Sequence, residues 1–279
     1  MAATSLSVRR ILPASLRYLR DLWGRREFAW HLARGNLKAR NATTALGLLW
    51  WVLNPLLLGA IYVVVFGIIL KVSRSRDDYV SYLLSGMFAF YYTRSSMVAG
   101  VNSIVQNTRL LANLNFPRLI LPFSGMVESA YGFVASLAVF YVIVWPIEGT
   151  LPGSGIVFLV PIAVIQTLFN FGLAALVARI AVPFRDINNL VPYLLRLWLY
   201  LSPIIYSASF LDDRDVPAIL RRLLEINPMF PMLGVYRHAL IGDPFRGSDL
   251  VLSTVWASAV FVIGIASFVR SEGRMARYL

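Results

Sequence analysis

Residues 47–70 form an uncharged run of twenty-four residues, GLLWWVLNPLLLGAIYVVVFGIIL, and this run limits most strongly how the chain can fold. About 20 apolar residues in a helix cross the hydrocarbon core of a bilayer. The forty-six residues before the run carry nine Lys and Arg side chains, and basic residues beside a span favour the cytoplasmic side. The run therefore predicts a membrane-spanning helix with a cytoplasmic N-terminal flank.

Apolar character extends over the whole chain. Hydrophobic residues make up 58% and charged residues 14%, which lies outside the usual range for a soluble domain. The net charge of +12 comes from cations placed beside apolar segments, not from one long basic tract. Anionic lipid head groups are therefore the expected partner, and nucleic acid is not. With no cysteine and two histidines, a disulfide framework is excluded and a metal site is not expected.

Five further apolar segments follow the first one and complete six predicted spans, which cover residues 79–101, 119–145, 156–178, 187–207 and 250–269. The segments that this topology places in the cytoplasm hold sixteen Lys and Arg, and the outer loops hold eight. We expect an all-α integral membrane fold with both termini in the cytoplasm. Its predicted parts are a cytoplasmic N-terminus (1–46), a six-helix transmembrane domain (47–269) and a cytoplasmic tail (270–279).

Residues 26–40, REFAWHLARGNLKAR, are amphipathic. Apolar residues recur at helical spacing, which predicts a helix in the cytoplasmic interface, and they are Phe28, Leu32, Ala33 and Leu37. The opposite, wet face is expected to carry Arg26, Arg34, Lys38 and Arg40.

A second stretch between the fifth and sixth predicted spans is too short to cross the bilayer. Asp215 is a suitable helix cap with Pro217 in the first turn, and MFPMLGVYRHALIG follows Asn227 and Pro228. We expect residues of about 215–242 to form short re-entrant helices in the outer leaflet.

No motif in the chain indicates ATP hydrolysis or catalysis. GxxxxGK[ST], HExxH and GxSxG are all missing, and Lys38 and Lys71 lack the glycine spacing of a phosphate-binding loop. Any ATP is therefore expected to be hydrolysed by a separate subunit, and this chain is expected to hold no cofactor. The acidic residues Asp212, Asp213 and Asp215 are read as a solvated capping turn, with a cation or sugar contact as the alternative.

Three ionisable residues, Arg94, Glu128 and Arg196, fall within predicted spans at a similar depth, about a third of the way across from the cytoplasmic side. Charges at such a depth are costly unless they are paired or wetted. One interpretation is a buried ion pair that fixes helix packing. The other is a set of charges that line the inner mouth of a path for an anionic or sugar-bearing substrate.

The aromatic residues likewise allow a structural and a functional interpretation. Trp50 and Trp51 lie near a span end, where interfacial aromatic belts occur, as do Tyr79, Tyr82 and Trp145. A deeper set either packs in the core or offers a sliding surface for sugar faces, and it consists of Phe90, Tyr91, Tyr92, Trp198 and Tyr200.

The second cytoplasmic loop, QNTRLLANLNFPRLILPFS from Gln106, has an amphipathic first half followed by Phe116 and Pro117. This pattern predicts a short helix that stops against the next span. Its apolar side chains are expected to be exposed and to dock on a partner, and they are Leu110, Leu111, Leu114 and Phe116.

Taken in order and spacing, these segments resemble the membrane subunits of ABC-2 type exporters of lipid-linked polysaccharide, which include O-antigen, teichoic acid and mycobacterial galactan exporters. The resemblance covers nearly the whole chain. It rests on GLLWWVLNPLL from Gly47, YLLSGMFAF from Tyr82, NTRLLANLNFPRLILP from Asn107, FRD from Phe184, LSPIIYS from Leu201 and INPMFPMLGVYRHAL from Ile226.

The resemblance implies that two copies of the chain form a pathway across the bacterial inner membrane, with two ABC ATPase subunits that bind Mg-ATP below. A coupling helix at about 106–118 would sit in the ATPase, near the turn at Arg185 and Asp186. The implied contact residues are Asn107, Arg109, Leu110, Asn113, Phe116, Pro117, Arg118, Arg185 and Asp186. Family members often carry lysines where this chain has Ala112 and Asn113, so this surface is expected to be partner-specific.

The resemblance also places the basic interface helix at a lateral gate, where a polyprenyl pyrophosphate would be taken up by Arg25, Arg26, Arg34, Lys38 and Arg40. The short outer helices would close the exit. The expected function is ATP-driven export of a polysaccharide linked to this lipid. The alternatives are an exporter of small hydrophobic compounds and, in another class, a membrane glycosyl- or phospho-transferase, against which the scarcity of His and acidic residues argues.

Overall fold

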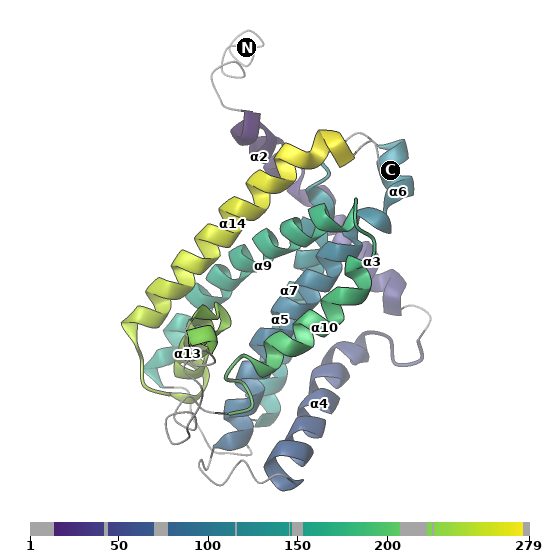
Figure 1. Ribbon diagram of the computed structural model, residues 1–279. Coiled ribbons are helices and arrows are strands. Elements are labelled where there is room, and N and C mark those ends of the chain that lie inside the picture. Colours follow the sequence, from purple (N-terminus) through teal and green to yellow (C-terminus); the bar gives the residue numbers. More distant parts are fainter. Residues whose placement is uncertain are drawn as a thin grey trace, which may run out of the picture.

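The computed structural model describes residues 14–41, 44–69, 78–114, 116–144, 146, 153–206, 222–224 and 226–275, and these residues form helices and turns without any strand. The all-α class expected from the sequence is thus confirmed. Two N-terminal helices, α2 (Ala14–Gly24) and α3 (Arg26–Asn41), lie beside a helical bundle (Figure 1). The bundle contains α4 (Trp50–Tyr62), α5 (Tyr79–Val105), α7 (Ile120–Val139), α9 (Leu159–Ala181), α10 (Ile187–Tyr200), α13 (Met229–Ile241) and α14 (Gly247–Met275).

Three described helical segments are long and apolar enough to cross a membrane, and they are Ile120–Val142, Ser154–Ala181 and Gly247–Gly273. The first extends α7 into the π-helical segment η4 (Phe140–Val144), and the second begins in the 3₁₀ segment η5 (Ser154–Phe158). Helix α4 likewise continues into the π-helical segment η2 (Val63–Ile69). The first segment and the α4–η2 helix lie within the predicted stretches 119–145 and 47–70, and the other two segments extend past both ends of the predicted spans 156–178 and 250–269.

Helix α5 is the centre of the bundle, where it packs along α7 and α9 and also contacts α10 and α13. All ten residues from 81 to 90 are buried. With 27 residues, α5 is about 40 Å long. Because protein surrounds residues 81–90, this half of α5 accommodates serine and glycine that a lipid-facing helix would carry less readily.

Helix α10 is shorter than the predicted span at 187–207. It has 14 residues and ends at Tyr200, and residues 201–206 form turns. Pro203 has no backbone N–H to donate to a preceding turn, and its ring hinders continuation of the helix. The apolar residues after Tyr200 therefore extend the hydrophobic run without extending the helix.

Small residues allow the central helices to approach closely. A Cβ atom placed on Gly172 of α9 would lie 2.5 Å from the carbonyl oxygen of Val260 in α14. A Cβ atom on Gly100 of α5 would lie 2.6 Å from the carbonyl oxygen of Ala174. Backbone contact of this kind is the usual way in which membrane helices gain packing without a hydrophobic driving force.

The molecule has two distinct ends (Figure 1). Helix α2, the short helix α6 (Thr108–Asn113) and the last turns of α14 lie together at one end, which we call the α6 end. Helix α13 and the second half of α4 lie at the opposite end, called the α13 end.

Candidate functional site

Three helices bring arginine and tyrosine side chains together on one side of α5. The hydroxyl of Tyr62 in α4 lies within electrostatic range of Tyr91 and Arg94 in α5 and of Arg196 and Tyr200 in α10. We call these five residues the Arg–Tyr face. Arg94 donates from Nη1 to the Tyr91 hydroxyl at 2.8 Å, and its guanidinium carbon lies 5.0 Å from the Tyr91 ring centroid.

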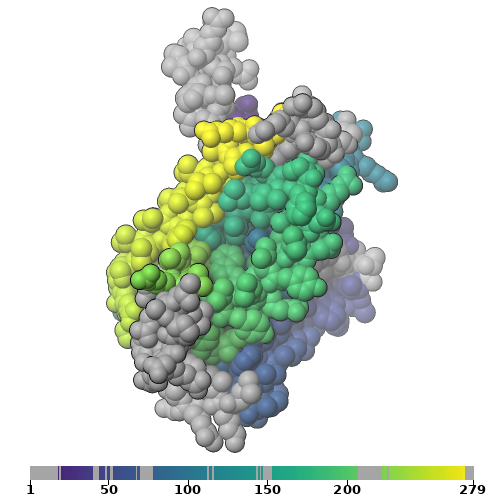
Figure 2. All heavy atoms as spheres, viewed as in Figure 1, coloured from purple at the N-terminus to yellow at the C-terminus, as the bar shows by residue number. Residues whose placement is uncertain are grey.

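The Arg–Tyr face is open to the outside of the single chain. Arg94 and Arg196 are exposed, and Tyr200 is 51% exposed. Helix α10 buries Val191, Leu195 and Leu199 on its inner side. Its outer side belongs to the surface in the space-filling view (Figure 2). A face with two arginines at this depth in a hydrophobic bundle is suited to water, protein or a polar ligand and is poorly suited to lipid.

The structure separates the ten residues predicted to line a pathway. Tyr91, Arg94, Arg196 and Tyr200 belong to the Arg–Tyr face, and the sequence reasoning missed Tyr62. Its only signal was a hydroxyl group within the apolar run at 47–70.

Phe90 and Tyr92 are packed in the interior instead, and Trp198 is half-buried against this core. Phe90 is 1% exposed and meets Trp198 edge to face at 5.8 Å. Tyr92 stacks on Phe133 at 4.9 Å, and its hydroxyl lies 2.9 Å from the Thr167 hydroxyl. Phe90 and Tyr92 therefore pack in the core of the single chain, and neither belongs to the open Arg–Tyr face.

Arg94 is exposed, which does not fit a buried ion pair, and its guanidinium donates to Tyr91 on its own helix. Glu128 is half-buried on α7, one turn from Tyr131 and on the same side of that helix. Trp50 is half-buried in the first turn of α4. The side chain of Trp51 lies outside the described residues.

Helix α3 has the two faces that its periodicity predicts. Of the predicted apolar face, Ala33 and Leu37 are buried and Phe28 and Leu32 are half-buried, and Ala29 is buried beside them. Helix α3 packs along α7. The basic residues point the other way and are exposed, and they are Arg25, Arg26, Arg34 and Lys38. The side chain of Arg40 lies outside the described residues.

Two tryptophans accompany these cations, which the sequence reasoning did not anticipate. The Arg26 guanidinium lies 5.4 Å from the Trp23 ring, and Trp23 is 67% exposed. The Arg34 guanidinium lies 5.4 Å from the Trp30 ring and donates from Nε to the Tyr131 hydroxyl at 3.4 Å. Paired tryptophan and arginine at WxxR and WxxxR spacing was the available signal.

The predicted short helix after Gln106 is α6. Asn107 lies before it and donates from Nδ2 to the Ser103 carbonyl at 2.8 Å. Arg109, Asn113 and Leu114 are exposed. The turn with Arg185 and Asp186 is also exposed.

The expectation that Phe116 is exposed is wrong. Its side chain is 8% exposed and meets the Phe28 ring of α3 at 5.4 Å. Leu110 and Leu111 are half-buried against the same cluster. The apolar face of α6 thus supports α3, and of the four apolar residues expected to dock, Leu114 is the exposed one at 52%.

Pro117 and Arg118 join α6 to α7 beside the last turns of α14. The backbone N–H of Arg118 donates to Glu272 Oε1 at 2.9 Å, and Arg118 Nη1 donates to the Glu272 carbonyl at 3.2 Å. Next to them, the Leu119 N–H donates to the Tyr18 hydroxyl at 3.2 Å. Burial, and then the negative charge of Glu272, raise the pKa of Tyr18 well above its usual value.

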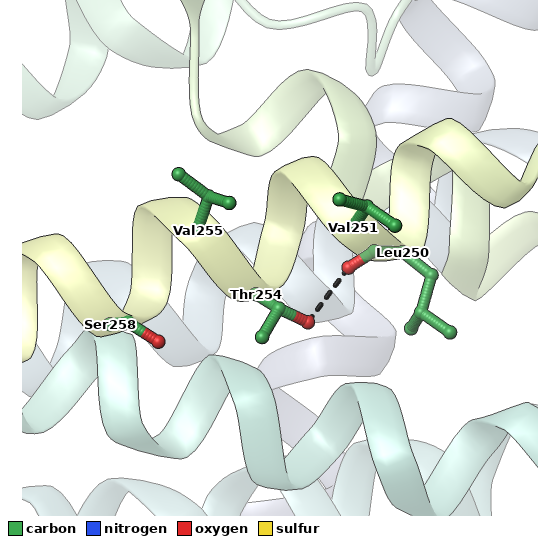
Figure 3. Close-up of a pocket in the computed structure, with 5 residues that line it drawn as sticks. All are labelled: Leu250, Val251, Thr254, Val255 and Ser258. Atoms are coloured by element: carbon green, nitrogen blue, oxygen red, sulfur yellow. Dashed lines mark hydrogen bonds between the residues drawn. The ribbon is translucent and has the colours of Figure 1, made fainter.

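A shallow apolar depression lies elsewhere, along the outward side of α14 (Figure 3). It is lined by Leu250, Val251, Thr254, Val255 and Ser258, all from this one helix. The Thr254 hydroxyl donates to the Leu250 carbonyl at 2.8 Å and is thereby satisfied. This surface suits acyl chains and carries no charged group.

Several predicted features lie outside the described residues. They include the acidic residues Asp212, Asp213 and Asp215 with Pro217, the belt residue Trp145, Lys71 in the first outer loop, and residues 276–279 of the tail.

The chain is similar to known transport proteins. Residues 27–241 match the family described as ABC-2 type transporter. A relative from Myxococcus xanthus, named O-antigen export system permease protein RfbA, is 27% identical over 92% of this chain and 96% of its own length. A Klebsiella pneumoniae protein of the same name is 25% identical over 88% of this chain and 92% of its own length. The chain belongs to the ABC-2 type transporter family, and it is a membrane transport subunit rather than an enzyme.

Proposed function

We propose that this chain is the permease of an ATP-driven exporter that moves a polysaccharide linked to polyprenyl pyrophosphate out of the cytoplasm. The relatives named as O-antigen export permeases support the substrate class. The observation that carries the proposal is the Arg–Tyr face. It offers cations and aromatic rings at membrane depth on the outside of a single chain.

Two copies facing each other would enclose this surface. Arg94, Arg196 and Tyr200 are exposed in one chain, and a second copy would replace lipid with protein and water. The rings of Tyr62, Tyr91 and Tyr200 suit the apolar faces of sugars, and the guanidinium groups suit hydroxyl and acidic substituents. We therefore infer a homodimer in which the glycan passes between the two Arg–Tyr faces.

The lipid pyrophosphate would be taken up at α3. Arg26 and Arg34 are exposed beside Trp23 and Trp30, and such pairs of cation and tryptophan suit the head-group region of a bilayer. The bond from Arg34 to Tyr131 fixes one guanidinium near α7. Arg25, Lys38 and Arg40 complete the proposed pyrophosphate site, while the polyprenyl chain stays in the bilayer.

The α6 end would face the cytoplasm and two ABC ATPase subunits, which supply Mg-ATP. This orientation follows from the surplus of basic residues in the segments assigned to that side and implies the bacterial inner membrane. Arg109, Asn113 and Leu114 of α6, with Arg185 and Asp186, form the exposed surface proposed to meet the ATPases. Phe116 is not part of this exposed surface, because its side chain is buried against Phe28 of α3.

Depletion of the protein in its native host tests this proposal. Polyprenyl-linked glycans are extracted and sized from the cytoplasmic and outer sides of the membrane. Completed polymer is expected to accumulate on the cytoplasmic side. Normal export would contradict the proposal and favour an exporter of small hydrophobic compounds, and a truncated glycan would favour a transferase.

The same depleted host, complemented with variants, tests the Arg–Tyr face. Arg94→Met and Arg196→Met are expected to keep normal abundance and lose export. The matched control is Arg246→Met, because Arg246 is an exposed arginine just before α14. Equal export by all three variants would remove this face from the proposed pathway.

A further inference from the structure

A short buried turn near the α13 end has its carbonyl groups bound by side chains. Residues 201–206 follow α10, and Ser202 and Ile204 are fully buried. A backbone that leaves a helix within a membrane bundle gives up its regular hydrogen bonds, and each unpaired carbonyl is costly there. The side chains that donate to these carbonyls identify the helices to which the turn is bound.

One group of donors comes from the first turn of α5. The Tyr79 hydroxyl donates to the Ile205 carbonyl at 3.0 Å. The Tyr82 hydroxyl donates to the Tyr206 carbonyl at 3.1 Å and lies 3.4 Å from the Pro203 carbonyl. Both tyrosines are buried, so solvent does not compete for these bonds.

A second group joins the turn to α13. Arg237, which is 6% exposed, donates from Nη2 to the Pro203 carbonyl, and its guanidinium carbon lies 3.5 Å from the Tyr82 ring centroid. The Arg237 guanidinium of α13 thus contacts both the turn and α5.

Asn227 adds a further connection. Its Nδ2 donates to the Leu201 carbonyl and to the Ser202 hydroxyl, both at 2.9 Å. Its Oδ1 accepts from Trp198 Nε1 at 2.8 Å and from the Met229 N–H at 3.0 Å. We call Tyr79, Tyr82, Asn227, Arg237 and the turn 201–206 the outer clamp.

The opposite end of α5 leads directly into α6. The Asn107 N–H donates to the Ile104 carbonyl at 3.2 Å, and the Leu110 N–H donates to the Asn107 carbonyl at 3.0 Å. Two residues, Gln106 and Asn107, separate the two helices, and both are hydrogen-bonded. A single helix of 27 residues therefore connects α6 to the outer clamp.

We propose that α5 and the outer clamp move as one body and carry displacement of α6 to the turn 201–206 and to α13. Arg237 and Tyr82 are then positioning residues that couple ATP hydrolysis at one side of the membrane to opening of the exit at the other. Buried, charge-assisted bonds favour joint movement over separation. This inference rests on the proposed export function.

The first test compares ATP hydrolysis with export in the full complex of permease and ATPase. Arg237→Met is expected to keep ATP hydrolysis near the wild-type rate and to reduce glycan export about tenfold, the size of a typical coupling term. Tyr82→Phe removes the hydroxyl and keeps the ring, and it is also expected to reduce export while ATP hydrolysis continues. It takes the place of Arg237→Met in this test if that variant fails to accumulate. Arg246→Met is the matched control and should export normally.

The second test uses the absence of cysteine from the chain. A Cβ atom on Gly86 would lie 3.6 Å from Ile204 Cα, so residues 86 and 204 are close enough to be tested as a cysteine pair, Gly86→Cys with Ile204→Cys. The same Cβ atom would lie 3.2 Å from Arg237 Nη2, so the arginine must shift slightly wherever it is kept. In the Arg237→Met background, oxidation is expected to restore export and reduction to abolish it again. In the chain that keeps Arg237, export should be the same in the oxidised and the reduced state, a comparison in which the two cysteines themselves do not differ.

The outcomes separate the two proposals. Loss of export on oxidation of the otherwise unchanged chain would show that the turn must leave α5, and this would overturn the inference. Wild-type export by both Arg237→Met and Tyr82→Phe would overturn it as well. A wild-type complex that exports no glycan would instead refute the proposed function.

Discussion

At the residue scale, a buried glutamine connects three helices of the bundle. Gln166 of α9 donates from Nε2 to the Ala89 carbonyl at 2.7 Å and to the Thr93 hydroxyl at 2.9 Å. Its Oε1 accepts from the fully buried Tyr236 hydroxyl of α13 at 2.6 Å. Hydrogen bonds of this kind specify which faces of apolar helices meet, because a misplaced helix would leave the amide unpaired.

Gln166→Leu is expected to lower the free energy of unfolding by about 1–2 kcal/mol, because the Tyr236 hydroxyl then lacks its acceptor. The double variant with Tyr236→Phe should lose less than the single one, since no buried hydroxyl is left over. Thermal unfolding of the purified protein in detergent measures both, and Thr254→Val at the exposed side of α14 is the control. Strictly additive losses would contradict this account.

A charge exchange tests the role of Arg94. If Arg94 and Glu128 formed a pair, Arg94→Glu combined with Glu128→Arg would restore function. Arg94 is exposed and donates to Tyr91, as expected for a residue of an open face, so we expect export to remain lost in the double variant while protein abundance stays normal. Recovery of export in the assay with the depleted host would reinstate the ion-pair interpretation.

At the element scale, hydrogen bonds and ring contacts attach helices α2 and α3 to the bundle at the α6 end. Tyr18 of α2 accepts from Leu119, Phe28 of α3 packs on Phe116, and Arg118 binds Glu272 of α14. The raised pKa of Tyr18 means that the native state holds the phenol proton more tightly than the unfolded chain. Its contribution to stability is therefore complete below about pH 10, the usual tyrosine value, and is lost only above it.

Tyr18→Phe is expected to loosen α2 and α3 while the bundle stays intact, because it removes the acceptor of the Leu119 N–H. Hydrogen exchange followed by mass spectrometry should show faster exchange over residues 14–41 and unchanged exchange over α9. In the wild-type protein this protection should be constant between about pH 6 and pH 9, well below the titration of Tyr18. Unchanged exchange in the variant would show that the bond does not hold these helices.

Hydrophobic runs and their basic flanks were sufficient to predict the all-α class, the approximate positions of α4, α5, α7, α9 and α14, and the two faces of α3. They could not predict which residues of an all-apolar helix face outward, because that depends on neighbouring helices. Phe90 and Tyr91 are adjacent in sequence, and the first is buried while the second meets Arg94. The end of α10 was also missed, because residues 201–206 remain apolar after the helix stops.

At the scale of the whole molecule, the two outward sides of the bundle differ in chemistry. The α14 side is apolar, with Val255 58% exposed and Val262 61% exposed. The α10 side presents Leu197, which is 57% exposed, beside Arg196. An arginine within a span is costly against lipid, up to about 2.5–3.5 kcal/mol at the centre, so we expect the α10 side to face a second copy and the α14 side to face lipid.

Single cysteines in this cysteine-free chain distinguish the two sides. Leu197→Cys is expected to form disulfide-linked dimers on mild oxidation in native membranes, because two copies would bring α10 against α10. Val255→Cys, which is equally exposed, should remain monomeric on the same gel. Dimers through Val255→Cys alone would place the interface on α14, and the two Arg–Tyr faces could not then enclose a glycan pathway between them.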